Sequence, residues 1–180
     1  QAVPLLRPTT PVIGTGMEGV AAVNTNQVEL AKEDGTVSYV DGSRIEVIYD
    51  SGRKATFNLD VYRRTNQGTC FHQHPVCVTG QKIKKGDILA DGAASEFGDL
   101  ALGQNILVAY LPWEGYNFED AVIISNRLVK DDKFSSVHIE DFTVDVRDTK
   151  LGPEIVTRDI PNVGEARLKD LDENGVVRVG

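Results

Sequence analysis

The stretch that decides the fold is GTVSYVDGSRIEVIYDSGRKATFN, residues 35–58. Asp-Gly and Asp-Ser-Gly turn signals divide it into three short runs rich in β-branched and aromatic residues, at 36–40, 44–49 and 54–58. In the middle run, Ile45, Val47 and Tyr49 recur at every second position and therefore share one face of a strand. The pattern predicts a meander of three antiparallel strands.

Strand signals continue toward the C-terminus. Regularly spaced glycines punctuate residues 78–92, a pattern typical of tight corners in a small barrel or sandwich. The most apolar run, 102–112, and the shorter run 121–125 predict strands that are buried on both faces. Residues 137–146 alternate between apolar and polar side chains, which predicts a strand with one solvent-facing side.

Helix signals are few. Residues 126–134 predict one helix, with Ser125 or Asn126 as its N-cap, and residues 165–171 predict a second. The first eleven residues contain three prolines and predict an extended segment. Together these signals predict a mainly β fold with a few short helices. A change to charge-rich, alternating sequence marks a break near residue 137.

Composition narrows the class of protein. The 180 residues carry a formal net charge of −8, which argues against a general nucleic-acid binder with a basic face. No apolar run approaches the roughly 20 residues of a membrane span, and no signal peptide precedes the first strand. The two cysteines do not form a disulfide framework, so we expect a cytoplasmic protein without a membrane partner. The missing initiator Met and the final GVVRVG favour a segment of a longer chain.

An acidic pair, Glu119 and Asp120, lies between a turn-like Gly-Tyr-Asn and an apolar run. Neighbours on a strand point to opposite faces, so one of the two carboxylates can face a cleft. Carboxylate oxygens suit Mg²⁺, which commonly takes one or two protein carboxylates together with phosphate oxygens. The alternative is a solvated turn before a strand, which is the more common role of exposed charges.

A second cluster, CFHQHPVC at 70–77, contains four residue types that bind zinc: Cys70, His72, His74 and Cys77. The spacing is not that of a zinc knuckle, which uses separated close pairs of ligands. The two cysteines can equally be small buried residues.

A non-catalytic module is the alternative at the level of function. The Gly-punctuated pattern at 78–92 is similar to hairpins of lipoyl and biotinyl carrier domains, but no exposed lysine at a tight hairpin flanked by small residues or Met is evident. The chain has no nucleophile elbow, P-loop or dinucleotide fingerprint. A β-rich binding or carrier-like module therefore stays open on these residues alone.

Ordered blocks along the whole chain resemble the β subunit of bacterial, multisubunit DNA-dependent RNA polymerase. The blocks are QAVP (1–4), GTGME (14–18), RTNQ (64–67), GDILADG (86–92), LALGQN (100–105), GYNFEDA (115–121), HIE (138–140), RDTKLGPE (147–154), DIPN (159–162) and LDE (171–173). The family subunit is far longer than this chain. The resemblance implies that residues 1–136 are part of the β-subunit core of the active-centre barrel, in the hybrid-binding region. It implies that residues 137–180 begin the flap, or wall.

The resemblance also implies roles for single residues. Asp120 would approach the second Mg²⁺, the ion bound to the nucleoside triphosphate, and Glu119 would assist nearby in nucleotidyl transfer to the RNA 3′ end. Gln1 would lie close to the RNA–DNA hybrid. The family has no general zinc site in the 70–77 stretch, so no zinc is expected there.

The partners implied by the resemblance are the subunits of the enzyme and its substrates. The β′ subunit would hold the permanent Mg²⁺ of a two-metal mechanism. The α and ω subunits, a sigma factor, the DNA template, the RNA product and NTPs complete the set. We expect the isolated chain to be inactive.

Overall fold

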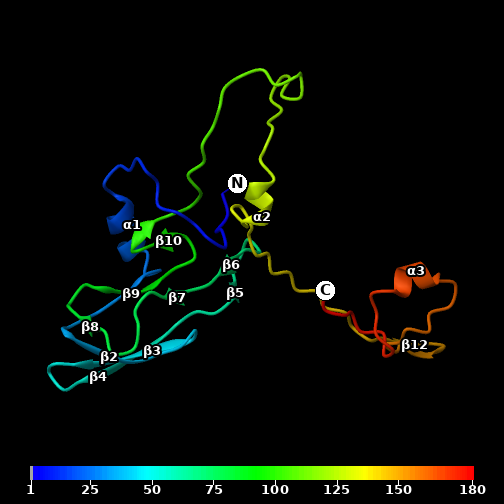
Figure 1. Ribbon diagram of the computed structural model, residues 1–180. Coiled ribbons are helices and arrows are strands. Elements are labelled where there is room, and N and C mark those ends of the chain that lie inside the picture. The colour runs from blue at the N-terminus through cyan, green and yellow to red at the C-terminus, as the bar shows by residue number, and fades with distance from the viewer. Residues whose placement is uncertain (1) are drawn as a thin grey trace. The chain divides into compact units, whose positions relative to one another are not determined.

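The computed structural model describes residues 2–180. The chain forms two compact units, which divide after Glu140. Antiparallel strands supply most of the regular structure, and the described residues contain three short helices (Figure 1). The predicted fold class, mainly β with a few short helices, is confirmed. None of the sheets within residues 2–180 closes into a barrel.

The predicted meander is the centre of a four-stranded sheet in the first unit. Its strand order is β4-β3-β2-β8, and all neighbours are antiparallel. The strands are β2 (Gly35–Val40), β3 (Arg44–Tyr49), β4 (Lys54–Asn58) and β8 (Lys82–Ile83). A side chain at Gly35 would place its Cβ 2.5 Å from the Ile48 carbonyl oxygen, so the close β2–β3 approach requires glycine there.

The alternation on β3 sets the buried face of this sheet. Ile45 and Val47 are 0% and 1% exposed, and Tyr49 is also buried, whereas Ile48 on the opposite face is 42% exposed. Full burial of one such aliphatic side chain stabilises the fold by about 1.5–3 kcal/mol. The hydrophobic core of the first unit therefore lies on the Ile45 side of the meander.

A three-stranded sheet closes the other side of this core. Its order is β1-β9-β7, with β1 (Glu29–Leu30), β9 (Ile88–Asp91) and β7 (His74–Pro75). Leu89 and Ala90 are fully buried and join the same hydrophobic cluster as the meander. The glycine pattern at 78–92 correctly indicated tight corners: Gly86 turns the chain into β9 with a φ of 91° and donates its N–H to Ala31 O.

A buried carboxylate organises the turn after β9. Asp91 is 1% exposed and accepts hydrogen bonds from the backbone N–H groups of Phe97 (2.7 Å) and Gly98 (2.8 Å), and from the Ser95 hydroxyl. This turn leads into the hairpin β10 (Ser95–Glu96) and β11 (Asp99–Leu100). A second small hairpin pairs β5 (Arg63–Arg64) with β6 (Cys70–Phe71). These pairs are two residues long, too short for sequence periodicity to predict.

The three helices are α1 (Glu18–Asn24), α2 (Arg127–Lys130) and α3 (Glu165–Leu168). The latter two lie inside the predicted ranges but are shorter, and α1 was not predicted. Its first turn is organised by Glu18, whose carboxylate accepts the N–H groups of Thr15 and Gly16. These bonds, with that of Thr15 the strongest, lower the pKa of Glu18 to about 2.

Three predicted strands are wrong. Residues 102–112 and 121–125 contain no strand, and most of their apolar side chains are exposed, Leu107 completely. Residues 137–146 form only an isolated bridge, between His138 and Thr69. A strand needs a continuous hydrogen-bonded neighbour as well as apolar side chains, and among the described residues 102–112 and 137–146 have only single bridges, Gly103 with Thr9 and His138 with Thr69.

The second unit, from Asp141 to Gly180, is small. It contains the hairpin of β12 (Asp148–Thr149) and β13 (Gly152–Pro153), together with α3. Leu168 is its buried hydrophobic residue, and Arg178 N–H donates to Asp170 O to bring the last residues back toward the end of α3. The assignment of residues 1–136 to the barrel core and of 137–180 to the flap stays a prediction.

Candidate functional site

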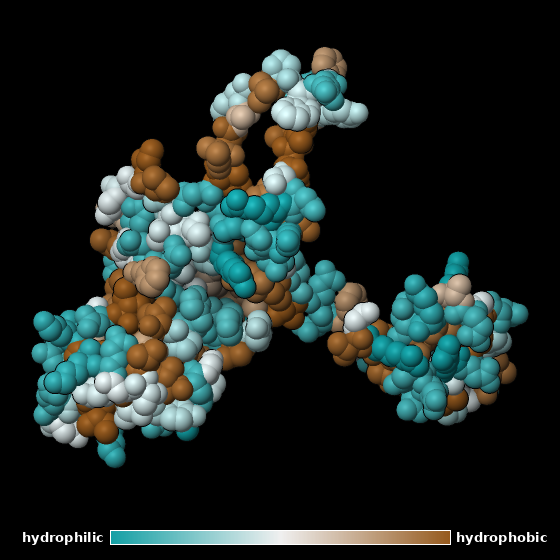
Figure 2. Space-filling model, viewed as in Figure 1, coloured by the Kyte–Doolittle hydropathy of each residue, from teal (hydrophilic) through white to brown (hydrophobic). Residues whose placement is uncertain are grey.

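The acidic pair lies on a long loop between β11 and α2, which projects from the first unit (Figure 1). The base of the loop is fixed to the N-terminal segment, because the Asn105 side chain donates to Thr10 O at 2.7 Å and Thr9 N–H donates to Gly103 O. Hydrophobic residues lie along both arms of the loop (Figure 2). The loop is therefore anchored at its base and offers an apolar surface along its length.

The tip of the loop is ordered by one side chain, Asn117. Its amide oxygen accepts the Trp113 N–H at 2.9 Å, and its amide nitrogen donates to Leu111 O at 2.7 Å. Backbone turns close the same segment, from Tyr116 N–H to Trp113 O and from Phe118 N–H to Gly115 O. Asn117 thus connects both sides of the turn immediately before the acidic pair, as asparagine commonly does in turns.

The two carboxylates follow this turn directly. Glu119 has a φ of 60°, a left-handed conformation that is uncommon for a residue other than glycine. Both residues are exposed, and neither side chain has a hydrogen bond or ion pair within residues 2–180. Glu119 lines an open hollow of about 470 Å³ at the tip, together with Asn117 and Phe118, whereas Asp120 does not line it. The tip presents two negative charges with no cation to neutralise them.

The donor chemistry of this pair fits a magnesium ion that arrives with phosphate groups. One or two carboxylates with free oxygens are the usual protein share of such a complex. A resident metal needs more: within the described part of the chain, no three His, Cys, Asp or Glu residues gather around a common point. The two carboxylates alone could supply at most a part of a magnesium coordination shell.

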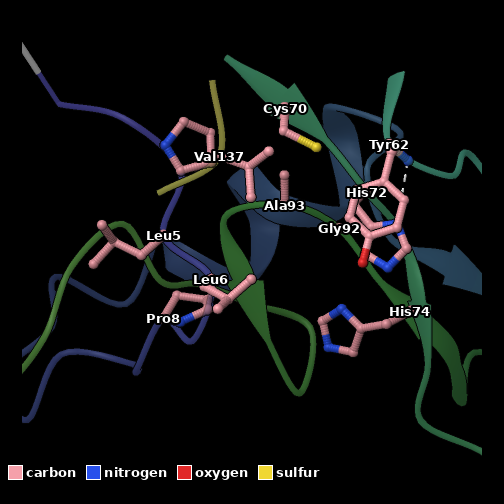
Figure 3. Close-up of a pocket in the computed structure, with 11 residues that line it drawn as sticks. Leu5, Leu6, Pro8, Tyr62, Cys70, His72, His74, Gly92, Ala93 and Val137 are labelled. Carbon is pink, nitrogen blue, oxygen red and sulfur yellow. Dashed lines mark hydrogen bonds between the residues drawn. The ribbon is translucent and has the colours of Figure 1, made fainter. Parts of the chain in front are cut away.

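The Cys/His cluster is divided by the fold. Cys70, His72 and His74 line one cavity (Figure 3), whereas Cys77 is buried in the hydrophobic core of the first unit. Burial raises the pKa of both thiols, so they remain protonated at neutral pH. The four residues do not form a tetrahedral ligand set, and the expected absence of zinc stays a prediction. Gln1, the residue expected near the hybrid, lies outside the described residues.

His72 has a defined local partner. Its ring stacks on Tyr62 with a centroid separation of 4.4 Å, and its Nδ1 accepts the Tyr62 N–H at 3.3 Å. Desolvation, followed by repulsion from His74, lowers the pKa of His72. The neutral imidazole is the form that this contact requires, because a protonated Nδ1 cannot accept a hydrogen bond.

Comparison with known families shows the family to which the chain belongs. The model for RNA polymerase Rpb2, domain 6, matches residues 30–180. The chain belongs to the RNA polymerase Rpb2 domain 6 family. The β-subunit resemblance carried by the motifs is confirmed, and the membership favours it over a carrier-like module.

This Rpb2 domain 6 chain is similar to bacterial proteins. Over its full length, the chain is 57% identical to the DNA-directed RNA polymerase subunit beta of Synechococcus elongatus. It is 54% identical to the proteins of the same name from Gloeobacter violaceus and Caldicellulosiruptor bescii. The chain spans only about a sixth of the length of these curated relatives, 16%, 16% and 15% respectively. Within residues 2–180, no helix is long and apolar enough to cross a membrane.

Sequence reasoning missed one residue of the site. Asn117 was read only as part of a turn-like Gly-Tyr-Asn, although its side chain orders the tip that carries the acidic pair. The available signal was its position: Asn117 lies two residues after Gly115 and two residues before Glu119, and asparagine near glycine is common in turns.

Proposed function

We propose that this chain is a segment of a polymerase β subunit that supports template-directed transfer of a nucleotide from an NTP to the RNA 3′ end. The single observation that carries the proposal is the ordered tip, in which Asn117 bridges Trp113 and Leu111 directly before two unpartnered carboxylates. Membership of the Rpb2 domain 6 family supports the setting.

In this proposal Asp120 is the residue that meets the metal-bound triphosphate. When bound, Mg²⁺ supplies neutralisation of the phosphate charges that build up in the transition state. Asp120 contributes a negative oxygen toward that complex and biases where it rests. Glu119 keeps the local potential negative and lines the adjacent hollow. Asn117 limits the motion of the backbone from which both project, which reduces the cost of orienting the substrate.

The charge of the loop is consistent with this role, because residues 104–125 contain no lysine or arginine. Residues 104–125 contain Glu114, Glu119 and Asp120 as their charged side chains. Such a loop attracts a cation and repels free phosphate, so it engages a triphosphate only through a metal ion. The permanent ion and the cationic groups that hold RNA and triphosphate would come from elsewhere in the enzyme, the permanent ion from a β′ subunit. The α and ω subunits, a sigma factor, the DNA template and a cytoplasmic setting belong to the same proposal.

Nucleotide addition by the assembled full-length enzyme tests this role. We expect Asp120→Ala to slow single-nucleotide addition at limiting Mg²⁺ by at least about tenfold, the size of loss typical when a group that orients a metal complex is removed. Excess Mg²⁺ should restore part of the rate. Glu119→Ala should have a smaller effect of the same kind.

Asp145→Ala is the matched control, because Asp145 is also an exposed aspartate without a side-chain partner in residues 2–180. This variant should leave the Mg²⁺ dependence unchanged. An Asp120→Ala enzyme that assembles normally and elongates at the wild-type rate at every Mg²⁺ concentration would remove Asp120 from the mechanism.

A further inference from the structure

The second unit contains the one Asn-Gly pair of the sequence, Asn174–Gly175. The pair lies in the turn between Leu171 and Val177, which form an isolated antiparallel bridge. Asn174 is exposed, and its side chain has no hydrogen bond to any residue within 2–180. Because neither packing nor a hydrogen bond holds this amide, its carbonyl carbon is free to turn toward the backbone that follows it.

Gly175 supplies the group that can react with the amide. Its backbone nitrogen is uncrowded, because glycine has no side chain. The N–H of Gly175 donates to Asp172 O at 3.2 Å, at the long end of the range for such bonds. Attack of this nitrogen on Cγ of Asn174 closes a succinimide ring. The nitrogen loses its proton, the bond from Cγ to the amide nitrogen breaks, and ammonia leaves.

Water then opens the ring at either of its carbonyl carbons. Cleavage of the bond between the ring nitrogen and Cγ leaves an aspartate at position 174. Cleavage of the bond to the main-chain carbonyl carbon leaves an isoaspartate, in which the chain runs through the side-chain carbons and is longer by a single atom. The overall reaction consumes water and releases ammonia, so it needs neither an oxidant nor a cofactor.

Asn162 provides an internal comparison within the same unit. It is also exposed, and its side chain has no hydrogen bond among the described residues. The next residue is Val163, whose branched side chain crowds the backbone nitrogen that would attack. The side-chain amides of Asn105 and Asn117 are held by hydrogen bonds. A free, exposed amide is therefore followed by an uncrowded nitrogen at Asn174.

The turn has no room for a longer backbone. The Asp172 carboxylate accepts the N–H groups of Asn174 and Val176, both at 2.9 Å, and Asp172 N–H donates to Val176 O at 2.8 Å. Gly175 packs against Thr157, because a Cβ at this position would lie 2.4 Å from the Thr157 carbonyl carbon. An extra chain atom before Gly175 therefore separates groups that now meet. A new carboxylate near Asp172 adds repulsion between like charges.

We propose that Asn174 is a site of spontaneous deamidation, and that isoaspartate formed there opens the turn at 172–175. The hydrogen bond from Arg178 N–H to Asp170 O brackets this turn, and it is lost when the turn opens. The modification requires only water and time. It converts a neutral, ordered turn of the second unit into a charged and more mobile one.

Peptide mapping of the full-length protein, after incubation in mildly alkaline buffer, tests the chemistry. Trypsin places the two exposed asparagines on separate peptides, 159–167 and 170–178. We expect Asn174 to exchange its NH₂ for OH at least about tenfold faster than Asn162, because glycine leaves the attacking nitrogen uncrowded and valine does not. Labelling with an isoaspartate methyltransferase should mark peptide 170–178. An unchanged Asn174, or equal rates at the two positions, would overturn the proposed site.

Asn174→Gln separates the modification from the turn. The variant keeps an exposed amide, but its longer side chain makes ring closure much slower. After the same incubation, amide hydrogen exchange within 170–178 should rise at least about threefold in the wild type, because the turn opens, and stay unchanged in Asn174→Gln. Asn162→Gln is the matched control and should behave as the wild type does. Isoaspartate without faster exchange, or faster exchange in the incubated Asn174→Gln variant, would overturn the proposed opening.

Discussion

The side-chain oxygen of Asn117 accepts the backbone N–H of Trp113 at 2.9 Å, so one amide closes the turn that precedes the acidic pair. The same side chain donates to Leu111 O, which ties the turn to the incoming arm of the loop. The loop has few other contacts, because most of its apolar residues are exposed. The geometry of Glu119 and Asp120 therefore depends on Asn117 more than on packing.

Replacement of Asn117 tests this dependence. Asn117→Ala removes two hydrogen bonds worth about 0.5–1.5 kcal/mol each, so we expect nucleotide addition by the assembled enzyme to fall roughly tenfold. Assembly should be unaffected, since the bonds lie at an exposed tip. Asn174→Ala, at another exposed turn and with no side-chain hydrogen bond in the described chain, is the control. Equal rates for the two variants would contradict a positioning role for Asn117.

The buried Asp91 is expected to be a major stabilising residue of the first unit. Asp91→Ala leaves the N–H groups of Phe97 and Gly98 without their acceptor, which costs about 1–3 kcal/mol for each buried group that stays unsatisfied. Chemical denaturation should show a loss of roughly 2–4 kcal/mol in the free energy of unfolding. Asp50→Ala, at an exposed aspartate, should change it by less than about 0.5 kcal/mol. An unchanged free energy of unfolding in Asp91→Ala would mean that the N–H groups of the turn find other acceptors.

Two isoleucines on β3 provide a matched comparison of the core and the surface. Ile45 is fully buried in the meander, and Ile48 is 42% exposed on the opposite face. Ile45→Ala should lower the free energy of unfolding by about 2–5 kcal/mol, because it removes packed atoms and leaves a cavity. Ile48→Ala should cost clearly less. Similar losses for both, measured by denaturant titration, would show that the Ile48 face is covered in solution.

His72 is expected to make the first unit less stable in mild acid. The folded-state pKa of His72 is lowered, by desolvation and by repulsion from His74, so folding favours the neutral imidazole. This contribution to stability is fully present above the unfolded pKa of about 6.5 and is lost as the pH falls through the folded pKa. As the pH falls below about 6.5, the pKa of His72 in the unfolded chain, the free energy of unfolding of the wild type should therefore decrease more steeply with pH than that of His72→Gln. Parallel pH profiles for the two proteins would contradict the prediction.

Local patterns predicted the parts of the fold that depend on neighbouring residues. The meander, the glycine corners near Gly80 and Gly86, and the positions of α2 and α3 were correct, because turn residues and alternation act within a few positions. The helix α1 was missed because its start depends on Glu18, which caps the N–H groups of Thr15 and Gly16 with its side chain. The roles of Glu119 and Asp120 stay predictions.

The sequence by itself determined the β class of this protein, the alternation that buries Ile45 and Val47, and the family, since these rest on residue order and local spacing. Only the tertiary structure decided that the apolar run 102–112 lies on an exposed loop, that Asn117 orders its tip, and that Gly175 packs against Thr157. Strand pairing and tertiary packing join segments that are far apart in the chain. Apolar composition supplies the tendency to be buried, but a hydrogen-bonded neighbour decides whether a strand forms.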